Sequence, residues 1–236
     1  MLDGVPSLPE QYQPRPALEA EHRNALLRSS GTMAITASTT GVSGPAGAGK
    51  STTAIVLARD PQVRAHFNDG IIWLAFGRER TGAEVLRSLA GWLGLAAETA
   101  AGRQLTHDEL VTAISRALAG QRRLLLLDDI WTEEQLAAFA PLTAEGGLLG
   151  RLVTTRNDEL AGERAYKVEA LKEEEALRVL AGYMGSTAEQ LRGGGDSAAA
   201  TRLVEMCSGN PAMLRSVAAL CKKRRGTVPA LAYLEQ

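Results

Sequence analysis

The sequence predicts an α/β domain, with a parallel sheet and helices on both of its faces, followed by a small all-helical domain. Between residues 39 and 171, apolar runs of strand length alternate with segments of helical periodicity, and this alternation is typical of a covered parallel sheet. Beyond Leu171, apolar residues recur at helical spacing with no strand between them. The 236 residues are enough for two hydrophobic cores.

The α/β part contains several expected strands and helices. The first strand, "TTGVSG", is weakly apolar, whereas "GIIWLAF" is rich in β-branched and aromatic residues. Strands are expected at residues 39–44, 70–76, 122–131, 150–157 and 165–171. Helices are expected at residues 17–30, 50–60, 83–95 and 107–119, and the second of them should bury Ala54, Ile55, Leu57 and Ala58.

The C-terminal part is expected to be helical. Its helices are predicted at residues 172–184, 197–208 and 212–224, and the glycine-rich segment 185–196 is predicted to be a loop. Three parts follow from this pattern. They are an N-terminal segment and helix at residues 1–36 that packs on the next part, the α/β domain at residues 37–168, and the helical domain at residues 169–236.

Composition and charge limit the possible functions. The hydrophobic share of 45%, the charged share of 22% and the net charge of −1 fit a soluble protein and give no electrostatic case for nucleic acid binding. Cys207 and Cys221 are too few for a disulfide scaffold or a metal cluster, so we expect buried thiols in a reducing compartment. No apolar run approaches the roughly 18 residues of a membrane span. We therefore expect a soluble, cytoplasmic protein without membrane contact.

Residues 44–51 read "GPAGAGKS" and match the pattern G-x-x-x-x-G-K-[ST]. In this pattern the glycines let successive backbone N–H groups point at phosphate oxygens. Lys50 is then expected to reach the β- and γ-phosphates, and Ser51 to bind Mg²⁺. The helix that begins near Lys50 would direct its positive end at the same anion. The alternative is a glycine-rich turn without a ligand.

A second element, "LLLLDD", ends a buried strand in two carboxylates. Ligands of such sheets bind at the carboxyl ends of the strands. Asp128 is expected to bind Mg²⁺ through its water shell, and Asp129 to orient or polarise an attacking water near the γ-phosphate. The alternative is an acidic strand end that begins a turn, but the phosphate loop about 80 residues upstream favours the metal site.

Arg156 closes "RLVTTR", the next expected strand. It should emerge at the same edge of the sheet as Lys50 and Asp128. An always-charged guanidinium suits the terminal phosphate of a triphosphate, which carries more charge than a diphosphate. The alternative is a solvated surface arginine. Trp73 and Trp131 are expected to pack in the core or at strand ends.

Six ordered motifs carry a family resemblance: "GPAGAGKSTTA", "HFNDGIIWLAFG", "LLLLDDIW", "RLVTTRN", "ALKEEEALRVL" and "CSGNPAML". Together they resemble the NB-ARC nucleotide-binding module of STAND-class ATPases, the group of apoptotic protease-activating factors and plant disease-resistance proteins. The resemblance covers nearly the whole chain. It implies an ADP- or ATP-binding P-loop domain with Mg²⁺, followed by a helical lid domain.

The resemblance also assigns roles to individual residues. Asp128 binds Mg²⁺ and Arg156 senses the γ-phosphate. Pro211 in "GNPA" belongs to the helical lid that closes over the nucleotide, and Arg15 lies where an N-terminal segment touches the base. The residues implied to bind phosphate are Gly44, Ala46, Gly47, Ala48, Gly49, Lys50, Ser51 and Thr52.

The sequence departs from the family pattern in three places. Arg15 lies in "YQPRPALE" rather than in a glycine–arginine motif. Pro45 and Ala46 stand where the family often has glycine and methionine. The chain stops at Gln236, so we expect the winged-helix, effector and sensor-repeat domains of such proteins to be missing.

These features predict a nucleotide-operated switch that hydrolyses ATP slowly and can form homo-oligomers on activation. Slow turnover is expected because Asp129 is one methylene shorter than the glutamate of vigorous P-loop ATPases and because one chain offers no arginine finger from a second subunit. Two other classes remain open. The first is an AAA+-like motor or a P-loop kinase, and the second is a scaffold that holds ADP permanently.

Overall fold

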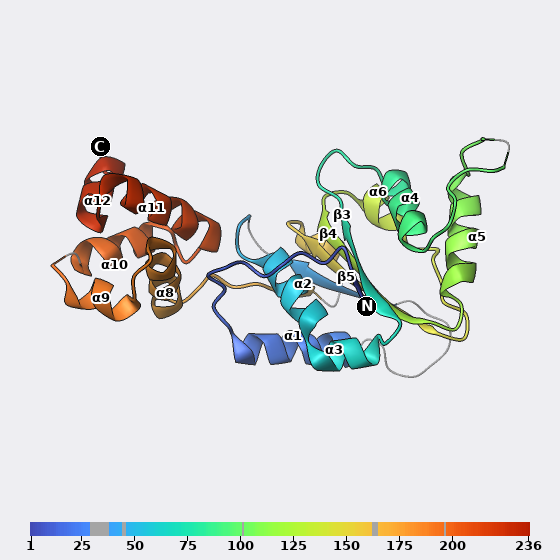
Figure 1. Ribbon diagram of the computed structural model, residues 1–236, viewed down its shortest axis with the longest axis horizontal. Coiled ribbons are helices and arrows are strands. Elements are labelled where there is room, and N and C mark those ends of the chain that lie inside the picture. Colours follow the sequence, from blue (N-terminus) through green and yellow to red (C-terminus); the bar gives the residue numbers. More distant parts are fainter. Residues whose placement is uncertain (29–37, 44–45, 101, 162–164, 196) are drawn as a thin grey trace. The chain divides into compact units, whose positions relative to one another are not determined.

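The computed structural model describes residues 1–28, 38–43, 46–100, 102–161, 165–195 and 197–236 (Figure 1). The chain divides into two compact units. The α/β unit comprises Met1–Ser7, Pro16–Gly44 and Lys50–Lys167. The helical unit comprises Leu8–Arg15, Pro45–Gly49 and Val168–Gln236. Each unit is described by itself below.

A six-stranded parallel sheet forms the centre of the α/β unit, in the order β1-β3-β4-β5-β2-β6. Its strands are β1 (Leu2–Asp3), β2 (Ser38–Ser43), β3 (Gly70–Ala75), β4 (Arg122–Ile130), β5 (Leu148–Thr155) and β6 (Ala165–Lys167). The five predicted strands are confirmed. The edge strand β1 was not predicted, because two residues are too few to show any periodicity.

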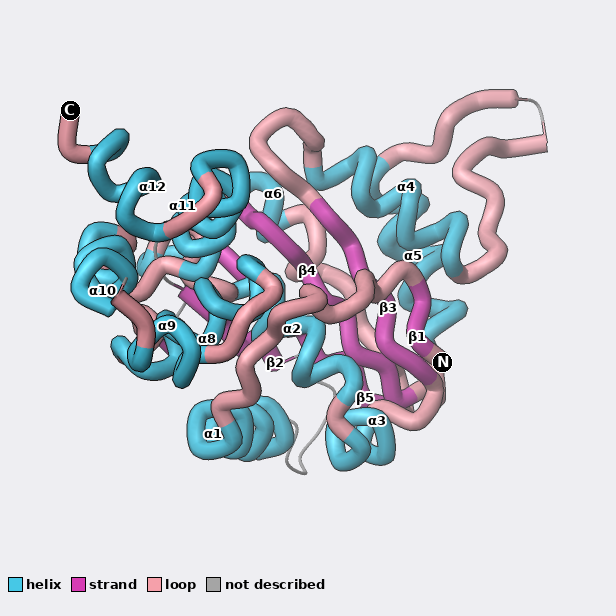
Figure 2. The backbone as a smooth tube through the Cα atoms, turned by 60° about the vertical axis from the view of Figure 1, so that its left-hand side comes forward, coloured by secondary structure: helices cyan, strands magenta, loops and turns pink. Residues whose placement is uncertain are grey.

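Helices cover both faces of this sheet, as predicted (Figure 2). The helices of the unit are α1 (Pro16–Arg28), α2 (Lys50–Arg59), α3 (Pro61–His66), α4 (Gly82–Trp92), α5 (His107–Leu118), α6 (Glu133–Ala137) and α7 (Asp158–Ala161). Helices α1, α2 and α3 lie on one face, and α4, α5 and α6 lie on the other. On the second face, Leu125 and Leu127 of β4 pack in one buried cluster with Leu86 and Leu89 of α4 and Ile114 of α5.

The three shortest helices of the unit, α3, α6 and α7, were not predicted. Helix α3 follows α2 after a single residue, and its start is fixed by local chemistry. The side chain of Asp60 accepts from the backbone N–H groups of Gln62 and Val63, and Pro61 occupies the first turn. An Asp–Pro pair at this place is a helix start signal that the apolar pattern alone does not reveal.

The helical unit has its own buried core. Its helices are α8 (Glu173–Met184), α9 (Ala188–Gly193), α10 (Ser197–Met206), α11 (Pro211–Arg224) and α12 (Thr227–Leu234). Cys207 and Cys221 are free and buried within it, as expected. The prediction of a loop at residues 185–196 is partly wrong, because Thr187 begins α9 with a capping box to Gln190. Helix α12 was not predicted either.

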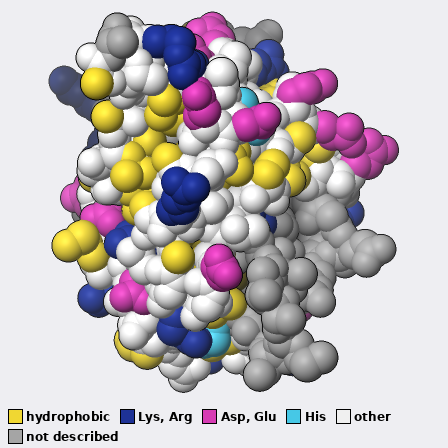
Figure 3. Space-filling view, turned by 90° about the vertical axis from the view of Figure 1, so that its right-hand side faces the viewer, with side chains coloured by type: hydrophobic (Ala, Val, Ile, Leu, Met, Phe, Trp, Pro, Cys, Tyr) yellow, Lys and Arg dark blue, Asp and Glu magenta, His cyan; other side chains and the backbone are white. Residues whose placement is uncertain are grey.

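Surface side chains of different kinds are mixed on the face shown in Figure 3, where acidic and basic groups lie among hydrophobic ones. No helix in the described ranges is long and apolar enough to cross a membrane.

Candidate functional site

The carboxyl end of β4 contains a β-bulge at Asp128 and Asp129. Leu127 pairs with Val153 and Ile130 pairs with Thr155, so β4 carries one residue more than β5 between these pairs. Asp129 adopts a left-handed backbone conformation with φ of 59°, which aspartate tolerates better than most residues. The bulge interrupts the regular alternation of side chains and so changes where these two carboxylates point, at the edge where ligands of parallel sheets bind.

Asp128 lies at the centre of a hydrogen-bond network. The Oγ of Ser51 donates to its Oδ1 at 2.7 Å, and the Oγ1 of Thr154 donates to the same atom at 2.6 Å. The Oγ1 of Thr154 also accepts from the backbone N–H of Asp129 at 2.9 Å. The structure therefore brings together the two residues that the sequence proposed for Mg²⁺, Ser51 and Asp128.

Thr154 was missed in the sequence. It is buried in β5 with 1% of its surface exposed. The signal was the pair of hydroxyl side chains, Thr154 and Thr155, at the end of a buried strand beside β4, since a buried hydroxyl requires a hydrogen-bond partner.

Burial shifts the pKa values of Asp128 and of Lys50, the first residue of α2. Burial raises the pKa of Asp128, although the hydroxyls of Thr154 and Ser51 act in the opposite direction. The pKa of Lys50 is lowered, first by burial and then by the nearby charge of Arg156, while Asp129 and Asp128 oppose this shift. Perturbed ionisation of this kind is typical of binding sites for charged ligands.

Arg156 follows β5 and lies beside Asp129. Its Nε is 3.7 Å from Oδ1 of Asp129, and its guanidinium carbon is 4.6 Å from the centre of the Trp131 ring. The prediction that its strand neighbours the Asp128 strand is confirmed, because β4 pairs with β5. With 43% of its side chain exposed, Arg156 is positioned by the protein and still accessible to a ligand.

The predicted phosphate loop leads directly into α2. Gly47 and Gly49 have positive φ values of 75° and 106°, which glycine adopts without strain. Helix α2 begins at Lys50, as predicted, and Thr52 lies half-buried in its first turn. Gly44 lies outside the described residues.

Within the helical unit, Asn210 contacts the residues that precede Lys50. Its Nδ2 donates to the carbonyl of Ala46 at 2.7 Å, and its Oδ1 accepts from the backbone N–H groups of Ala212 and Met213 at the start of α11. A Cβ atom on Gly47 would lie 2.6 Å from Oδ1 of Asn210. The family resemblance implied a role for the neighbouring Pro211, the first residue of α11, but none for Asn210. An asparagine before a proline is a helix start signal that could have identified it.

Arg15 forms hydrogen bonds and an ion pair with other residues of the helical unit. It donates to the carbonyls of Glu169 at 2.9 Å and Ala170 at 3.3 Å, and its Nε is 3.4 Å from Oε1 of Glu175. These bonds tie Leu8–Arg15 to the beginning of α8. A contact of Arg15 with a nucleotide base stays a prediction.

The residues present fit Mg²⁺. The hydroxyl of Ser51 and the carboxylate of Asp128 are hard oxygen donors, which Mg²⁺ prefers, and the ion is commonly held by one or two protein groups together with ligand phosphates. In the described part of the chain, no group of three or more His, Cys, Asp or Glu side chains could hold a metal by itself.

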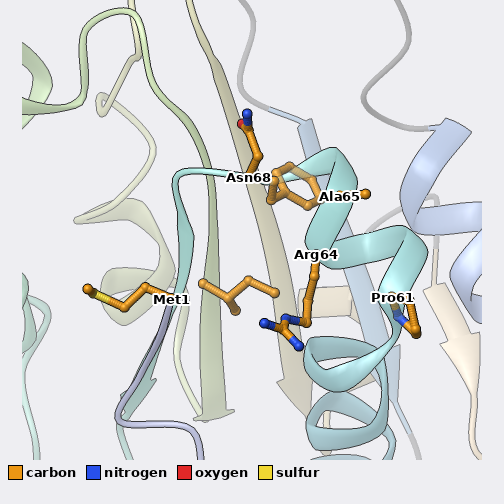
Figure 4. A pocket seen from close by; sticks show the side chains of 7 residues that line it. Met1, Pro61, Arg64, Ala65 and Asn68 are labelled. Carbon is orange, nitrogen blue, oxygen red and sulfur yellow. The ribbon is translucent and has the colours of Figure 1, made fainter.

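A separate pocket lies at the amino end of β3 (Figure 4). It is lined by Met1, Pro61, Arg64, Ala65, Phe67, Asn68 and Ile71. Asp128 pairs with Ala75 at the other end of β3. None of the predicted site residues lines this pocket.

The family model for the NB-ARC domain matches residues 23–189, more than half of the chain. The chain belongs to the NB-ARC family. The probable disease resistance protein At5g04720 of Arabidopsis thaliana is 29% identical over 186 residues, and disease resistance protein RPM1 of the same plant is 26% identical over 195 residues. Both alignments cover 78% of this chain and 21% of the relative, so this NB-ARC chain spans about a fifth of these relatives.

Solved structures of low sequence identity share the fold. Drosophila ORC bound to DNA gives a TM-score of 0.56 at 12% identity, covering 98% of this chain and 62% of that chain. The Aeropyrum pernix ORC1 protein in complex with DNA gives 0.53 at 15% identity, covering 99% and 68%. At these identities the similarity concerns the fold alone. Family and fold together identify the NB-ARC chain as a P-loop NTPase with a nucleotide-binding site.

Proposed function

We propose that this chain is the switch core of a STAND-class NTPase, which binds ADP or Mg·ATP and hydrolyses ATP slowly. One observation carries the proposal. The first turn of α2 and the bulged end of β4 meet through the 2.7 Å hydrogen bond from Ser51 to Asp128. A hydroxyl and a carboxylate that meet at the N-terminus of a helix support a magnesium–phosphate site there.

The remaining residues have separate roles in this proposal. Lys50 and the N–H groups at the start of α2 bind the β-phosphate, and Arg156 contacts the γ-phosphate. Ser51 and Asp128 hold Mg²⁺, which when bound would neutralise charge on the phosphates. Ala46, Gly47, Ala48, Gly49 and Thr52 complete the proposed phosphate-binding segment.

Slow hydrolysis has a local reason. Asp129, the group proposed to orient the attacking water, is short, and its carboxylate lies 3.7 Å from the charge of Arg156. Nucleotide identity, rather than rapid turnover, is then the signal, because it shifts a conformational equilibrium.

The likeness to disease resistance proteins supports a role in defence signalling, within a longer protein that carries effector, winged-helix and sensor domains and forms homo-oligomers on activation. A cytoplasmic location is part of the proposal, since the buried thiols of Cys207 and Cys221 are free.

Nucleotide extraction and thermal unfolding test the proposal. ADP at about 100 times its dissociation constant should stabilise the protein by about 2.7 kcal/mol, and Lys50→Ala should abolish most of this shift without unfolding the chain. ADP retained through purification supports a switch or a scaffold that holds ADP. An empty site with turnover that rises with protein concentration supports a motor, and phosphate loss that needs an acceptor supports a kinase. Unchanged melting at millimolar ADP contradicts nucleotide binding.

A further inference from the structure

Two arginines share the ring of Trp131, directly after β4. The guanidinium carbon of Arg78 lies over this indole at 4.1 Å from the ring centre, and that of Arg156 at 4.6 Å. Arg78 comes from the loop after β3, whereas Arg156 comes from the end of β5. Trp131, which the sequence predicted to serve in packing, therefore contacts two cations, and these follow the strands on either side of β4.

The backbone around this indole is fixed by one buried amide. Gln135 is 4% exposed, and its Oε1 accepts from the backbone N–H of Trp131 at 2.7 Å. Its Nε2 donates to the carbonyls of Gly77 at 2.9 Å and Arg80 at 2.8 Å. These bonds fix the position of the loop that carries Arg78 relative to the backbone of Trp131.

A further bond ties the same loop to the carboxylates. The backbone N–H of Gly77 donates to the carbonyl of Asp129 at 3.1 Å. Arg78, Trp131 and the bulge at Asp129 therefore form one connected edge of the sheet.

Three cations, Lys50, Arg78 and Arg156, lie at this edge, and Asp129 pairs with Arg156. Within the described residues Arg78 has no carboxylate partner, and its side chain is exposed. A guanidinium that lies over an aromatic ring still presents N–H donors to a phosphate, so an anionic ligand can be bound while the contact with the indole persists.

We propose that Trp131 is a positioning residue that holds Arg156 ready for the terminal phosphate of a nucleoside triphosphate, and that Arg78 is a second cation for that phosphate. The inference rests on the proposed function. It assigns recognition of the triphosphate state to a set of three residues rather than to Arg156 alone.

Calorimetric titration with ADP and with adenylyl imidodiphosphate, both with Mg²⁺, tests the inference on the full chain. Trp131→Leu should raise the dissociation constant of the analogue about three- to tenfold and that of ADP less than about twofold. Trp131→Phe keeps an aromatic face and should restore most of the affinity. Arg78→Ala should weaken the analogue about tenfold and leave ADP nearly unchanged.

Matched controls separate positioning from general damage. Trp92→Leu removes an exposed indole at the end of α4, and Arg116→Ala removes an exposed arginine of α5. Neither should change discrimination between the two nucleotides. Because Arg78 is exposed, Arg78→Ala tests the inference even if Trp131→Leu fails to fold.

The outcomes are distinct. Equal losses for both nucleotides, or no loss in Arg78→Ala, overturn the inference while the proposed function stands. If the unmodified protein binds neither nucleotide, the proposed function fails and this inference fails with it.

Discussion

Thr154 controls the direction of Asp128, although the two residues lie on different strands. The hydroxyl of Thr154 donates to the carboxylate of Asp128 at 2.6 Å and, through its lone pair, accepts from the backbone N–H that follows. The same hydroxyl therefore stabilises both the carboxylate and the bulge that presents it. Its environment is buried, where a lost hydrogen bond leaves polar groups without compensation.

Thr154→Val should destabilise the protein by about 1–3 kcal/mol, because it keeps the shape of the side chain and leaves the N–H of Asp129 and the oxygen of Asp128 without this partner. It should also raise the pKa of Asp128 further, since one hydrogen bond to the charged form is lost. Binding of Mg·ADP should then weaken more at pH 6 than at pH 8. Urea unfolding and calorimetry at both pH values measure these effects.

Thr155→Val is the matched control. Thr155 is equally buried, and its hydroxyl donates to the carbonyl of Ile130 at 2.9 Å. Thr155→Val should lose a similar free energy of unfolding, but its affinity for Mg·ADP should not fall more at pH 6 than at pH 8. The same pH dependence in both variants would show that Thr154 does not act through Asp128.

Asp128→Asn should raise the free energy of unfolding of the ligand-free protein above that of the unmodified chain. This gain should be larger at pH 7 than at pH 4. Because burial raises the pKa of Asp128 in the folded state, the folded protein holds the proton more tightly than the unfolded chain. That stabilisation is present at low pH and is lost as the pH rises from the unfolded pKa through the folded one. Asparagine can still accept from Ser51 and Thr154, and it removes the charge.

The expected cost of Asp128→Asn is the loss of Mg²⁺-dependent nucleotide binding. Unfolding at several pH values, with the exposed Asp108→Asn as control, measures the first effect, and titration of ADP with and without Mg²⁺ measures the second. Lower stability of Asp128→Asn at pH 7 than at pH 4, relative to the unmodified chain, would contradict the assigned direction of the pKa shift.

Much of the fold could be predicted because the long elements carry strong periodic signals. The four consecutive leucines of β4 and the apolar stripe of α5 are visible without a structure. The two-residue strand β1 and the helices of four to six residues, such as α6 and α9, could not be found in this way. They depend on caps and on strand pairing, and apolar spacing carries little information over so few residues.

The site could be predicted to the level of motifs, but the contacts between them could not. The pattern "GKS" and the pair of aspartates predicted that Ser51 and Asp128 belong to one site, and their hydrogen bond confirms the juxtaposition. The sequence did not reveal the bulge at Asp129 or the arginines on Trp131. These features arise from strand register and from side chains far apart in the chain.

Arg156→Ala should change discrimination between nucleotides rather than nucleotide binding in general. Loss of a charge-assisted contact should cost about 1.5–3 kcal/mol toward a non-hydrolysable ATP analogue and little toward ADP. The half-exposed ion pair with Asp129 contributes little to stability, so the fold should remain intact. Titration with both nucleotides, and with Arg116→Ala as control, decides the outcome. Equal losses for ADP and the analogue would make Arg156 a general anchor, and no loss would make it a surface residue.

Gly47→Ala should be more harmful than Gly49→Ala, although both glycines have positive φ values. At Gly47 a Cβ atom would lie 2.6 Å from Oδ1 of Asn210 and 2.7 Å from Cβ of Ala212, whereas at Gly49 it would meet nothing within 4 Å. Gly49→Ala therefore carries backbone strain alone, about 1–2 kcal/mol. Gly47→Ala adds steric overlap, about 1–3 kcal/mol more, and displaces the side chain that donates to Ala46.

A double-mutant cycle isolates the contact between Gly47 and Asn210. Asn210→Ala alone should cost about 1 kcal/mol, because α11 loses its N-cap. The double variant with Gly47→Ala and Asn210→Ala should lose less stability than the sum of the two single losses, since the overlap with Oδ1 disappears. Urea unfolding measures the four proteins. Strict additivity would mean that Asn210 does not constrain Gly47, and the greater harm of Gly47→Ala would then have to come from the contact with Ala212.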